Sequence, residues 1–341
     1  MKFVQIGDVH FDVPFTTISD RLNLGEQRRL EQRKAFKKVI DYIKDNDVEN
    51  LFICGDLYEN EYIRSSTIEY INKLFKEIEN TQIFIIPGNH DPFLNDSFYK
   101  NFKWNSNVKI FGSKIEKVEL DNVNIYGYGF DDFELNKNLE EIELDNNKFN
   151  ILLTHGDLYN ASKYNAINLK DIINKGFDYI AIGHIHKRDE YYSGSLISLG
   201  FDEPGEHGFI YGEVNENKLV RKFVKADSRE FITMEIDVSK YESKEDLIEA
   251  LNEIDTKDNL YEIIFVGNRK FDIEINIKLL QENIVKIKDK TKYSVNLEQK
   301  ENEKTLTGFF IKNLKEELNN QLITEEEYEK ILELGSNILN K

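Results

Sequence analysis

The sequence predicts an α/β protein organised around a largely parallel β-sheet. Short β-branched and aromatic runs end in glycine at several points, as at residues 3–6 before Gly7 and 51–54 before Gly55. Such runs are typical of buried strands at the point where they leave a sheet. Residues 27–45 and 65–79 lie between these runs and space their apolar side chains as an amphipathic helix does. Strands that alternate with helices predict crossover units and parallel pairing.

The remaining N-terminal elements follow from the same patterns. Three short strand-like pieces without intervening helices predict an antiparallel continuation, and an Asn- and Glu-rich stretch at 134–148 predicts a helix and a surface loop. The predicted strands are residues 83–86, 108–111, 115–120, 123–128, 149–154 and 179–182, with a helix at 169–175 and further strands within 191–212.

A second organisation begins near residue 227. Predicted strands at 231–238, 261–267 and 293–299, with helices at 244–253 and 275–288, indicate a small α+β unit. An amphipathic helix at 306–322 follows, and Thr324 with Glu327 fits a capping box that opens a last helix. We therefore expect three domains: a catalytic domain at 1–226, an α+β cap at 227–300 and a helical tail at 301–341.

Composition restricts the class of protein. The net charge of −18 argues against a nucleic-acid coat protein but not against a nuclease, since bound cations can supply positive charge where phosphates dock. No apolar run has the length of a membrane span and no secretory signal is visible, so we expect a cytoplasmic protein with no membrane partner. Cys54 is the single cysteine and lies in an apolar run, so we expect it to be a buried core residue.

Polar residues gather at the predicted strand ends. Five of the six histidines lie there, together with carboxylate and amide side chains. In open α/β sheets, ligands bind just beyond the carboxyl ends of the strands, so we expect these groups to meet at one edge. Imidazole and carboxylate donors without thiolate suit Mn²⁺, Fe²⁺, Zn²⁺ or Co²⁺, and seven donors suit two ions about 3.5–4 Å apart that share one carboxylate. The candidate ligands are Asp8, His10, Asp56, Asn89, His155, His184 and His186.

Each motif also has a purely structural interpretation. A lone Asp-x-His or Gly-Asp occurs by chance and can simply cap a turn, and a single histidine is more often a satisfied core residue than a ligand. Gly88-Asn89-His90-Asp91 is more specific, because three polar side chains after a buried strand are costly to bury unpaired. Five such motifs at strand ends favour a site over chance.

The ordered motifs resemble the calcineurin-like metallophosphoesterase superfamily, and within it the SbcD-type DNA-repair exonuclease subunits. The similarity lies in Asp8-x-His10, Gly55-Asp56, Gly88-Asn89-His90-Asp91, His155 and Gly183-His184-x-His186, and in a closing segment with Gly194-Ser195 and Phe201-Asp202-Glu203. The resemblance implies a metallophosphoesterase sandwich, with two mixed β-sheets flanked by helices, plus the small α+β cap and the C-terminal helices.

The resemblance also implies roles for the site residues. One ion would be held by Asp8, His10, Asp56 and His186, and the other by Asp56, Asn89, His155 and His184, with Asp56 bridging. Mn²⁺ is the expected metal, with Fe²⁺, Zn²⁺ and Co²⁺ as alternatives. His90 would be a catalytic histidine that is not a ligand, and Asp91 would orient its imidazole.

The function implied is two-metal hydrolysis of DNA phosphodiester bonds in DNA repair, with an SMC-like ABC ATPase docked on the C-terminal helices and a homodimer as a further option. The apolar stripes of these helices could equally pack on their own domain. The alternatives are a small-substrate phosphodiesterase or phosphatase of the same superfamily and a non-catalytic scaffold for DNA ends. The chain departs from the family pattern at Glu59, where several relatives carry histidine or aspartate. This departure leaves open the balance between exonuclease and endonuclease action.

Some basic and aromatic residues outside the motifs could meet DNA. Solvated surface charge is the commoner role for the basic residues, and packing is the commoner role for the aromatic ones. His207 lies in a Gly-rich turn and could contact substrate or have no role. The basic and aromatic candidates are Arg28, Arg29, Arg33, Lys34, Arg64, Lys187, Arg188, Trp104, Tyr191 and Tyr192.

Overall fold

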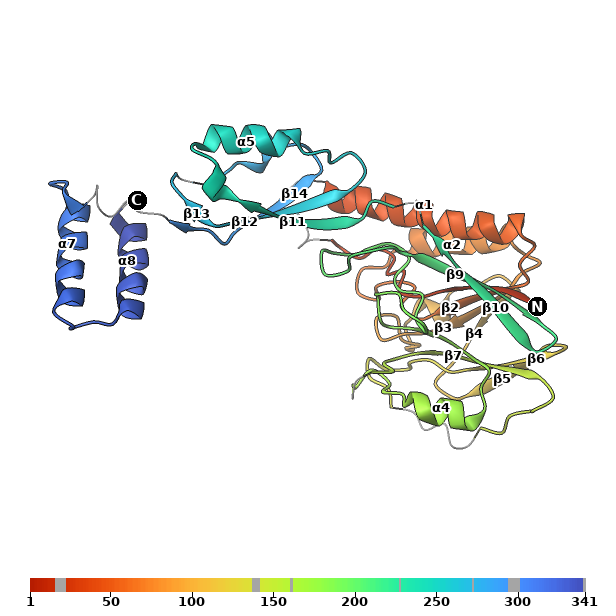
Figure 1. Cartoon of the computed structure of the whole chain (residues 1–341). Coiled ribbons are helices and arrows are strands. Elements are labelled where there is room, and N and C mark those ends of the chain that lie inside the picture. The colour runs from red at the N-terminus through yellow and green to blue at the C-terminus, as the bar shows by residue number, and fades with distance from the viewer. Residues whose placement is uncertain are drawn as a thin grey trace. The chain divides into compact units, whose positions relative to one another are not determined.

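The chain forms two compact units, Met1–Phe231 and Ile232–Lys341, in a computed structural model (Figure 1). The structure describes residues 1–15, 23–136, 142–159, 162–226, 228–271, 273–293 and 301–339. A separate third domain at 301–341 stays a prediction.

The first unit contains a six-stranded sheet with the order β10-β9-β1-β2-β3-β4. The four strands from β1 to β4 run parallel, and β9 and β10 continue the sheet in antiparallel pairing. The sheet is therefore mixed, as predicted. Its strands are β1 (Lys2–Ile6), β2 (Asn50–Cys54), β3 (Gln82–Ile86), β4 (Val108–Ile110), β9 (Gly208–Asn215) and β10 (Lys218–Lys225).

A second, four-stranded sheet has the order β5-β6-β7-β8. Its edge strand β5 pairs antiparallel with β6, whereas β6, β7 and β8 run parallel. The three strand-like pieces predicted as one antiparallel continuation are thus shared between two sheets. The strands are β5 (Glu116–Glu119), β6 (Val123–Gly127), β7 (Phe149–His155) and β8 (Tyr179–Gly183).

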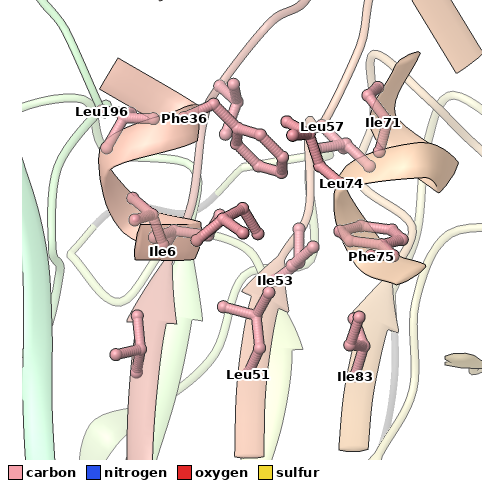
Figure 2. Close-up of a cluster of buried hydrophobic side chains, with 14 of the residues drawn as sticks. Ile6, Phe36, Leu51, Ile53, Leu57, Ile71, Leu74, Phe75, Ile83 and Leu196 are labelled. Atoms are coloured by element: carbon pink, nitrogen blue, oxygen red, sulfur yellow. The ribbon is translucent and has the colours of Figure 1, made fainter. Parts of the chain in front are cut away.

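Helices α1 (Leu24–Asp45) and α2 (Ser65–Lys76) cover one face of the larger sheet. Figure 2 shows Phe36 of α1 and Phe75 of α2 over strand residues such as Ile53, all fully buried. The helices α3 (Phe98–Asn101) and α4 (Leu169–Lys175) are shorter. Burial of each large apolar side chain contributes roughly 1.5–3 kcal/mol, so this interface holds the helices against the sheet.

The two sheets face each other through a second layer of core. Phe3 and Phe52 point from the larger sheet, with ring centroids 4.9 Å apart, and belong to the same buried cluster as Ile151 of β7. The next residue, Leu152, points the other way and shares a cluster with Ile172 of α4. Because neighbouring strand residues face opposite sides of a sheet, this alternation gives four layers: helices, sheet, sheet, helix.

The second unit has its own three-stranded sheet, with the order β11-β12-β14, and its own buried core, which includes Leu247, Leu251 and Ile263. Ser243 caps helix α5 by accepting a hydrogen bond from the Asp246 N–H. The elements are β11 (Phe231–Asp237), η1 (Val238–Lys240), α5 (Lys244–Glu253), β12 (Leu260–Val266), β13 (Asn268–Arg269), η2 (Ile277–Leu279), β14 (Ile284–Asp289) and β15 (Lys292–Tyr293).

The C-terminal helices are α7 (Leu306–Asn319) and α8 (Glu325–Leu339). Thr324 and Glu327 form the predicted capping box: the Glu327 N–H donates to Thr324 Oγ1 at 3.2 Å, and the Thr324 N–H donates to Glu327 Oε2 at 2.8 Å. Gly335 lies so close to the Phe310 ring that an added Cβ would be 2.2 Å from it, so the two helices pack closely.

Three secondary-structure predictions need correction. Residues 275–288 are not one helix: Asn276 caps the short turn η2, and β14 pairs in parallel with β12, so pairing in the sheet overrides helical spacing. Residues 191–207 contain only isolated bridges, and the next strand begins at Gly208. In 134–148 the described residues contain no helix, and 137–141 lie outside them, as do 294–300 of the predicted strand at 293–299.

Candidate metal centre

The seven candidate ligands come from the ends of strands in both sheets. The residues after β1, β2 and β3 belong to the larger sheet, and those at the ends of β7 and β8 belong to the smaller one. The expectation of one shared sheet edge is corrected accordingly: the site forms where the carboxyl ends of two stacked sheets meet. Stacking of the sheets, rather than the order within one of them, brings His155 to Asp56, with Nε2 and Oδ2 3.3 Å apart.

Four of these residues have left-handed backbone conformations. The φ angles are 51° at Asp8, 52° at His10, 52° at Asp56 and 112° at His184. Such angles are uncommon for residues with a Cβ and cost roughly 1–3 kcal/mol each, so they persist only where the surroundings impose them. They turn each side chain sharply inward as its strand ends.

Two glycines of the motifs leave space for the ligands. A Cβ on Gly88 would lie 2.2 Å from Asp56 Oδ1, and one on Gly55 would lie 2.2 Å from His155 Nδ1. Gly55 also has a φ of +88°. Glycine is therefore required at both positions for the loops to approach each other this closely.

One cluster of donor atoms consists of Asp8, His10 and His186, whose candidate atoms lie within 4.8 Å of one another. The Nε2 atoms of His10 and His186 are 3.1 Å apart, and His186 Nε2 lies 3.9 Å from Asp8 Oδ1. Asp8 is fully buried and accepts the His184 N–H at 2.9 Å. This backbone bond ties the β8 end to the β1 end.

A second cluster consists of Asp56, His155 and His184, within the same 4.8 Å limit. Asn89 lies between the two imidazoles, with its Oδ1 3.0 Å from His155 Nε2 and 3.2 Å from His184 Nδ1. His10 Nε2 lies 3.7 Å from Asp56 Oδ2, and His10, Asp56 and His90 form a third group of donors within the same limit, so Asp56 lies next to both clusters. These clusters correspond to the two ligand sets implied by the resemblance, which stay predictions.

Outer carboxylates fix the ring orientation in the first cluster. His10 Nδ1 donates to Glu59 Oε1 at 2.7 Å, and His186 Nδ1 donates to Glu203 Oε1 at 2.6 Å. With the Nδ1 protons engaged, both neutral rings present an Nε2 lone pair to the other across 3.1 Å. Two facing lone pairs repel each other unless a proton or a metal ion lies between them, and when both rings are neutral the donor set fits a bound metal ion.

In the second cluster, a hydrogen bond on Nδ1 likewise orients the His155 ring. His155 Nδ1 donates to the Cys54 carbonyl at 2.8 Å, which leaves its Nε2 lone pair facing the oxygens of Asn89 and Asp56. When His155 is neutral, three acceptors therefore converge on one point. Divalent ions with nitrogen and oxygen preference satisfy such a set, so both clusters fit metal ions.

Charges within the centre shift the pKa values of its side chains. Burial lowers the pKa of His155, but the Asp56 carboxylate outweighs burial and raises it to about 9. Burial likewise lowers the pKa of His186, and its bond to Glu203 raises it to about 9. Burial favours the neutral form of Asp56, yet the neighbouring imidazoles hold its pKa below the ordinary value. Protons and metal ions therefore compete for the same atoms.

The comparison with known families agrees with this geometry. The family model for calcineurin-like phosphoesterases matches residues 1–188, more than half of the 341-residue chain. The chain belongs to the calcineurin-like phosphoesterase family. A relative from Bacillus subtilis (strain 168), the uncharacterized metallophosphoesterase YhaO, is 25% identical over 248 residues, which cover 66% of this chain and 60% of the relative's own length. Family membership and donor set together make metal-dependent phosphoester hydrolysis the candidate chemistry.

His90 has a distinct place in the calcineurin-like phosphoesterase centre. Its backbone N–H donates to Asp56 Oδ1 at 2.8 Å. Its side chain is 45% exposed, whereas those of Asp8, His10, Asp56 and His155 are buried. His90 Nδ1 bonds to Glu59 Oε2 at 3.0 Å, and this bond raises the pKa of His90 to about 9. The Nε2 of His90 is thus the ring atom left to contact a substrate.

Asp91 has different partners from those expected. Its buried carboxylate accepts N–H groups from Gly88 at 2.6 Å and Leu57 at 2.6 Å, and the Tyr99 hydroxyl at 2.5 Å. No bond joins Asp91 to the His90 ring among the described contacts, and Glu59 is the carboxylate on that ring. Asp91 therefore holds the loops after β2 and β3 together, rather than orienting the imidazole directly.

Two carboxylates of this centre were not among the predicted site residues. Glu59 was noted as a departure from the family pattern, and it bonds to both His10 and His90. Glu203 lies in the closing segment, where it bonds to His186. His207 is buried and bonds to Ser195 and to the Glu203 carbonyl at 3.0 Å, so it supports this segment. The spacing Asp56-x-x-Glu59 was the available signal, but spacing alone does not show which ring a carboxylate reaches.

The remaining candidates divide between core and surface. Arg28 is fully buried and donates to the Ser198 carbonyl at 2.6 Å, and Trp104 packs against Phe102. Tyr192 is fully buried and donates to the Gly156 carbonyl at 2.7 Å. Cys54 is buried in the core, as predicted. Among the described residues, no helix combines the length and apolar character needed to cross a lipid bilayer.

Proposed function

We propose that this protein hydrolyses phosphodiester bonds of DNA with two divalent cations, Mn²⁺ being the expected metal. The observation that carries the proposal is the presence of two donor clusters, one of which contains Asp56, with Asp56 also 3.7 Å from His10 of the other and close to the exposed His90. When bound, the two ions would activate water, orient the phosphate and offset charge on the attacking and leaving oxygens.

The protein's own groups would do the positioning. Asp56 and the imidazoles define where the phosphate sits, because their donor atoms converge on one region. His90 would donate a proton to the departing oxygen through Nε2, since Glu59 occupies its Nδ1 at 3.0 Å. Glu59 bonds to both His10 and His90, so it couples the position of a ligand to that of the proton donor.

DNA as substrate, and a role as an SbcD-type repair nuclease, rest on the resemblance of residues 194–208 and of the regions beyond the catalytic motifs. The bond between Glu203 and His186 supports the significance of that closing segment. A small-substrate phosphodiesterase would share the centre without needing these later regions.

The deciding experiment is digestion of end-labelled linear DNA in Mn²⁺, run beside bis(p-nitrophenyl) phosphate. We expect both to be cleaved and chelation to stop both. Cleavage of the ester with intact DNA would replace the nuclease by a small-substrate enzyme. Binding of DNA ends without cleavage of either compound would support the scaffold alternative.

Two substitutions separate the predicted roles. His90→Ala should keep both metal ions and lose most turnover, on the order of 10²-fold or more, because proton transfer is removed. Asp56→Ala should lose metal and turnover together, since Asp56 lies in both ligand sets. Metal content by mass spectrometry and initial rates on the ester measure these effects. Wild-type metal content and rate in both variants would contradict the assignment.

We further propose that the α7–α8 pair docks onto an SMC-like ABC ATPase. The support is apolar exposure on these helices, with Leu306 79% exposed, Phe309 63% and Ile338 72%. The variant Leu306→Asp/Phe309→Asp should remain soluble and lose co-purification with the ATPase. Unchanged co-purification would reject this surface, and aggregation after deletion of 306–341 would favour a packing role for the helices.

A further inference from the structure

A pocket of about 380 Å³ lies beside the candidate metal centre, between the start of α1, the start of α2 and the loop that joins β2 to α2. Asp12 lines it two residues after the candidate ligand His10, and Tyr62 lines it three residues after Glu59. The Tyr62 N–H donates to the Glu59 carbonyl at 3.0 Å in a tight turn. Since two residues span at most about 7 Å, the backbone at Asp12 lies within about 7 Å of that of the candidate ligand His10.

Three side chains that line this pocket, Asp12, Arg33 and Thr67, form hydrogen bonds with one another. Asp12 accepts Arg33 Nη2 at 3.1 Å through Oδ1, and through Oδ2 it accepts the Thr67 hydroxyl at 2.7 Å and the Arg64 N–H at 3.1 Å. Arg33 also donates to Thr67 Oγ1 at 3.0 Å. The negative charge of Asp12 is therefore compensated by Arg33, and these bonds join α1 to α2.

Two further arginines, Arg29 and Arg64, line the pocket. The Arg29 guanidinium donates to the Pro14 carbonyl at 3.4 Å, and Arg64 is exposed. Within the part of the chain that the structure describes, neither guanidinium has a carboxylate at ion-pair distance. The other acidic residue of the lining is the exposed Glu26. In a chain with a net charge of −18, a pocket with more arginines than acidic groups is suited to an anion.

The pocket also offers an apolar wall. Tyr62 is 50% exposed and Leu30 is 54% exposed, and both line it. An exposed aromatic ring next to arginines can stack on a base while the arginines bind phosphate. A nucleotide presents both features in one unit, whereas inorganic phosphate presents only one.

We propose that this pocket binds the nucleotide next to the scissile phosphodiester of a DNA strand, with Arg29 and Arg64 on its phosphate and Tyr62 against its base. The inference rests on the proposed function and adds to it a subsite that favours a strand over an isolated diester. Such a subsite would act on substrate binding and leave the metal centre unchanged.

The test compares Arg29→Gln, Arg64→Gln and the double variant with Lys34→Gln. Lys34 is exposed on the same helix α1 and lies outside the pocket lining, so it is a matched control for the loss of one charge. Each arginine variant should lower kcat/KM on a single-stranded dodecanucleotide about tenfold, which corresponds to one charged hydrogen bond. On bis(p-nitrophenyl) phosphate, which has no neighbouring phosphate, all variants should match the wild type. Equal losses on both substrates, or an equal loss in Lys34→Gln, would overturn the proposal.

Binding provides a second measurement that does not depend on cleavage. In EDTA, the affinity for a fluorescein-labelled dodecathymidylate should fall in the double variant, and its salt dependence should weaken by about 0.7 in slope for one strand phosphate lost. Tyr62→Ala should weaken binding of this strand but not of an abasic strand of equal length, and Tyr62→Phe should restore it. If Tyr62→Ala weakened the binding of both strands equally, the proposed contact between Tyr62 and the base would be rejected.

These two arms also separate this inference from the proposed function. If the wild type cleaves the ester but not the dodecanucleotide, while the arginine variants still lose strand binding, the nuclease activity fails and the nucleotide site stands. If strand binding does not depend on Arg29 and Arg64, the site fails whatever the enzyme cleaves.

Discussion

At the scale of single residues, the centre depends on which nitrogen of each imidazole faces inward. Glu59, Glu203 and the Cys54 carbonyl each accept a hydrogen bond from an imidazole Nδ1–H. The Nε2 atom of each of these rings therefore faces the donor clusters. Outer partners of this kind fix both the tautomer and the orientation of a ligand ring. Glu203 and Glu59 are thus positioning residues for the metal centre.

Glu203→Gln tests this role. The substitution keeps the shape of the side chain but removes the charge that holds the His186 Nδ1 proton, so Mn²⁺ affinity should fall roughly 10–100-fold. Glu206→Gln is the control, because Glu206 is 55% exposed and pairs with Arg188 at the surface instead. Calorimetric titration with Mn²⁺ measures both. An affinity in Glu203→Gln equal to that of the control would show that the carboxylate is not needed.

At the scale of elements, the loops that follow β2 and β3 must approach each other closely. Asp91 makes this possible by accepting N–H groups from both loops and the hydroxyl of Tyr99 at the second position of α3. Burial raises the pKa of Asp91 to about 7, and Tyr99 and the Gly88 N–H oppose this rise. The loops are thus held by one buried side chain, as well as by chain connectivity.

Asp91→Asn should therefore destabilise the first unit. An amide would turn its NH₂ group toward the N–H donors that the carboxylate now accepts, which leaves buried donors unpaired at about 1–3 kcal/mol each. Asp96→Asn is the control, since Asp96 is exposed on the same loop. Urea denaturation followed by circular dichroism gives the two free energies of unfolding. A difference below about 0.5 kcal/mol between the variants would contradict the holding role.

Gly88→Ala tests the close approach of the loops after β2 and β3 by adding a methyl group between them. The new methyl group would lie 2.2 Å from Asp56 Oδ1 and 2.7 Å from the Asp56 nitrogen, so the Asp56 carboxylate must move. We expect Mn²⁺ content and ester hydrolysis to fall at least tenfold, because small displacements in a metal site reduce activity strongly. Gly112→Ala, which has open space at its Cβ, should behave as the wild type. Parallel losses in both variants would point to a general folding defect.

At the scale of the whole molecule, metal binding should be linked to the stability of one unit. The candidate ligands all come from Met1–Phe231, whereas Ile232–Lys341 has its own core. An ion that binds only the folded state adds about 2.7 kcal/mol at a hundred times its Kd. Mn²⁺ should thus raise the unfolding temperature of the first unit, and EDTA should reverse the shift.

Differential scanning calorimetry with and without Mn²⁺ measures this linkage. His155→Ala, which removes a fully buried donor from the second cluster, should reduce the shift. A shift of the same size in this variant would place the stabilising ion elsewhere in the protein.

Much of this architecture was predictable because its signals are local. Strand ends marked by Gly-Asp, Gly-Asn or Gly-His identified β1, β2, β3, β7 and β8, since glycine after a buried run is typical of the point where the backbone turns out of a sheet. Helix spacing located α1, α2 and α4 for a similar reason. The interval 275–288 was misassigned because β14 takes its conformation from its partner β12, which no local pattern records.

The sequence by itself determined the donor chemistry, because the identity of a side chain fixes what it can bind. Carboxylates, an amide and imidazoles at strand ends were sufficient to predict a divalent metal centre. The tertiary structure alone decided that two sheets share this centre, that Glu59 and Glu203 hold the His10 and His186 rings, and that Arg29 and Arg64 meet at one pocket. The physical reason is that hydrogen bonds and charge compensation depend on distances between segments, and these distances are set by how the sheets and helices stack.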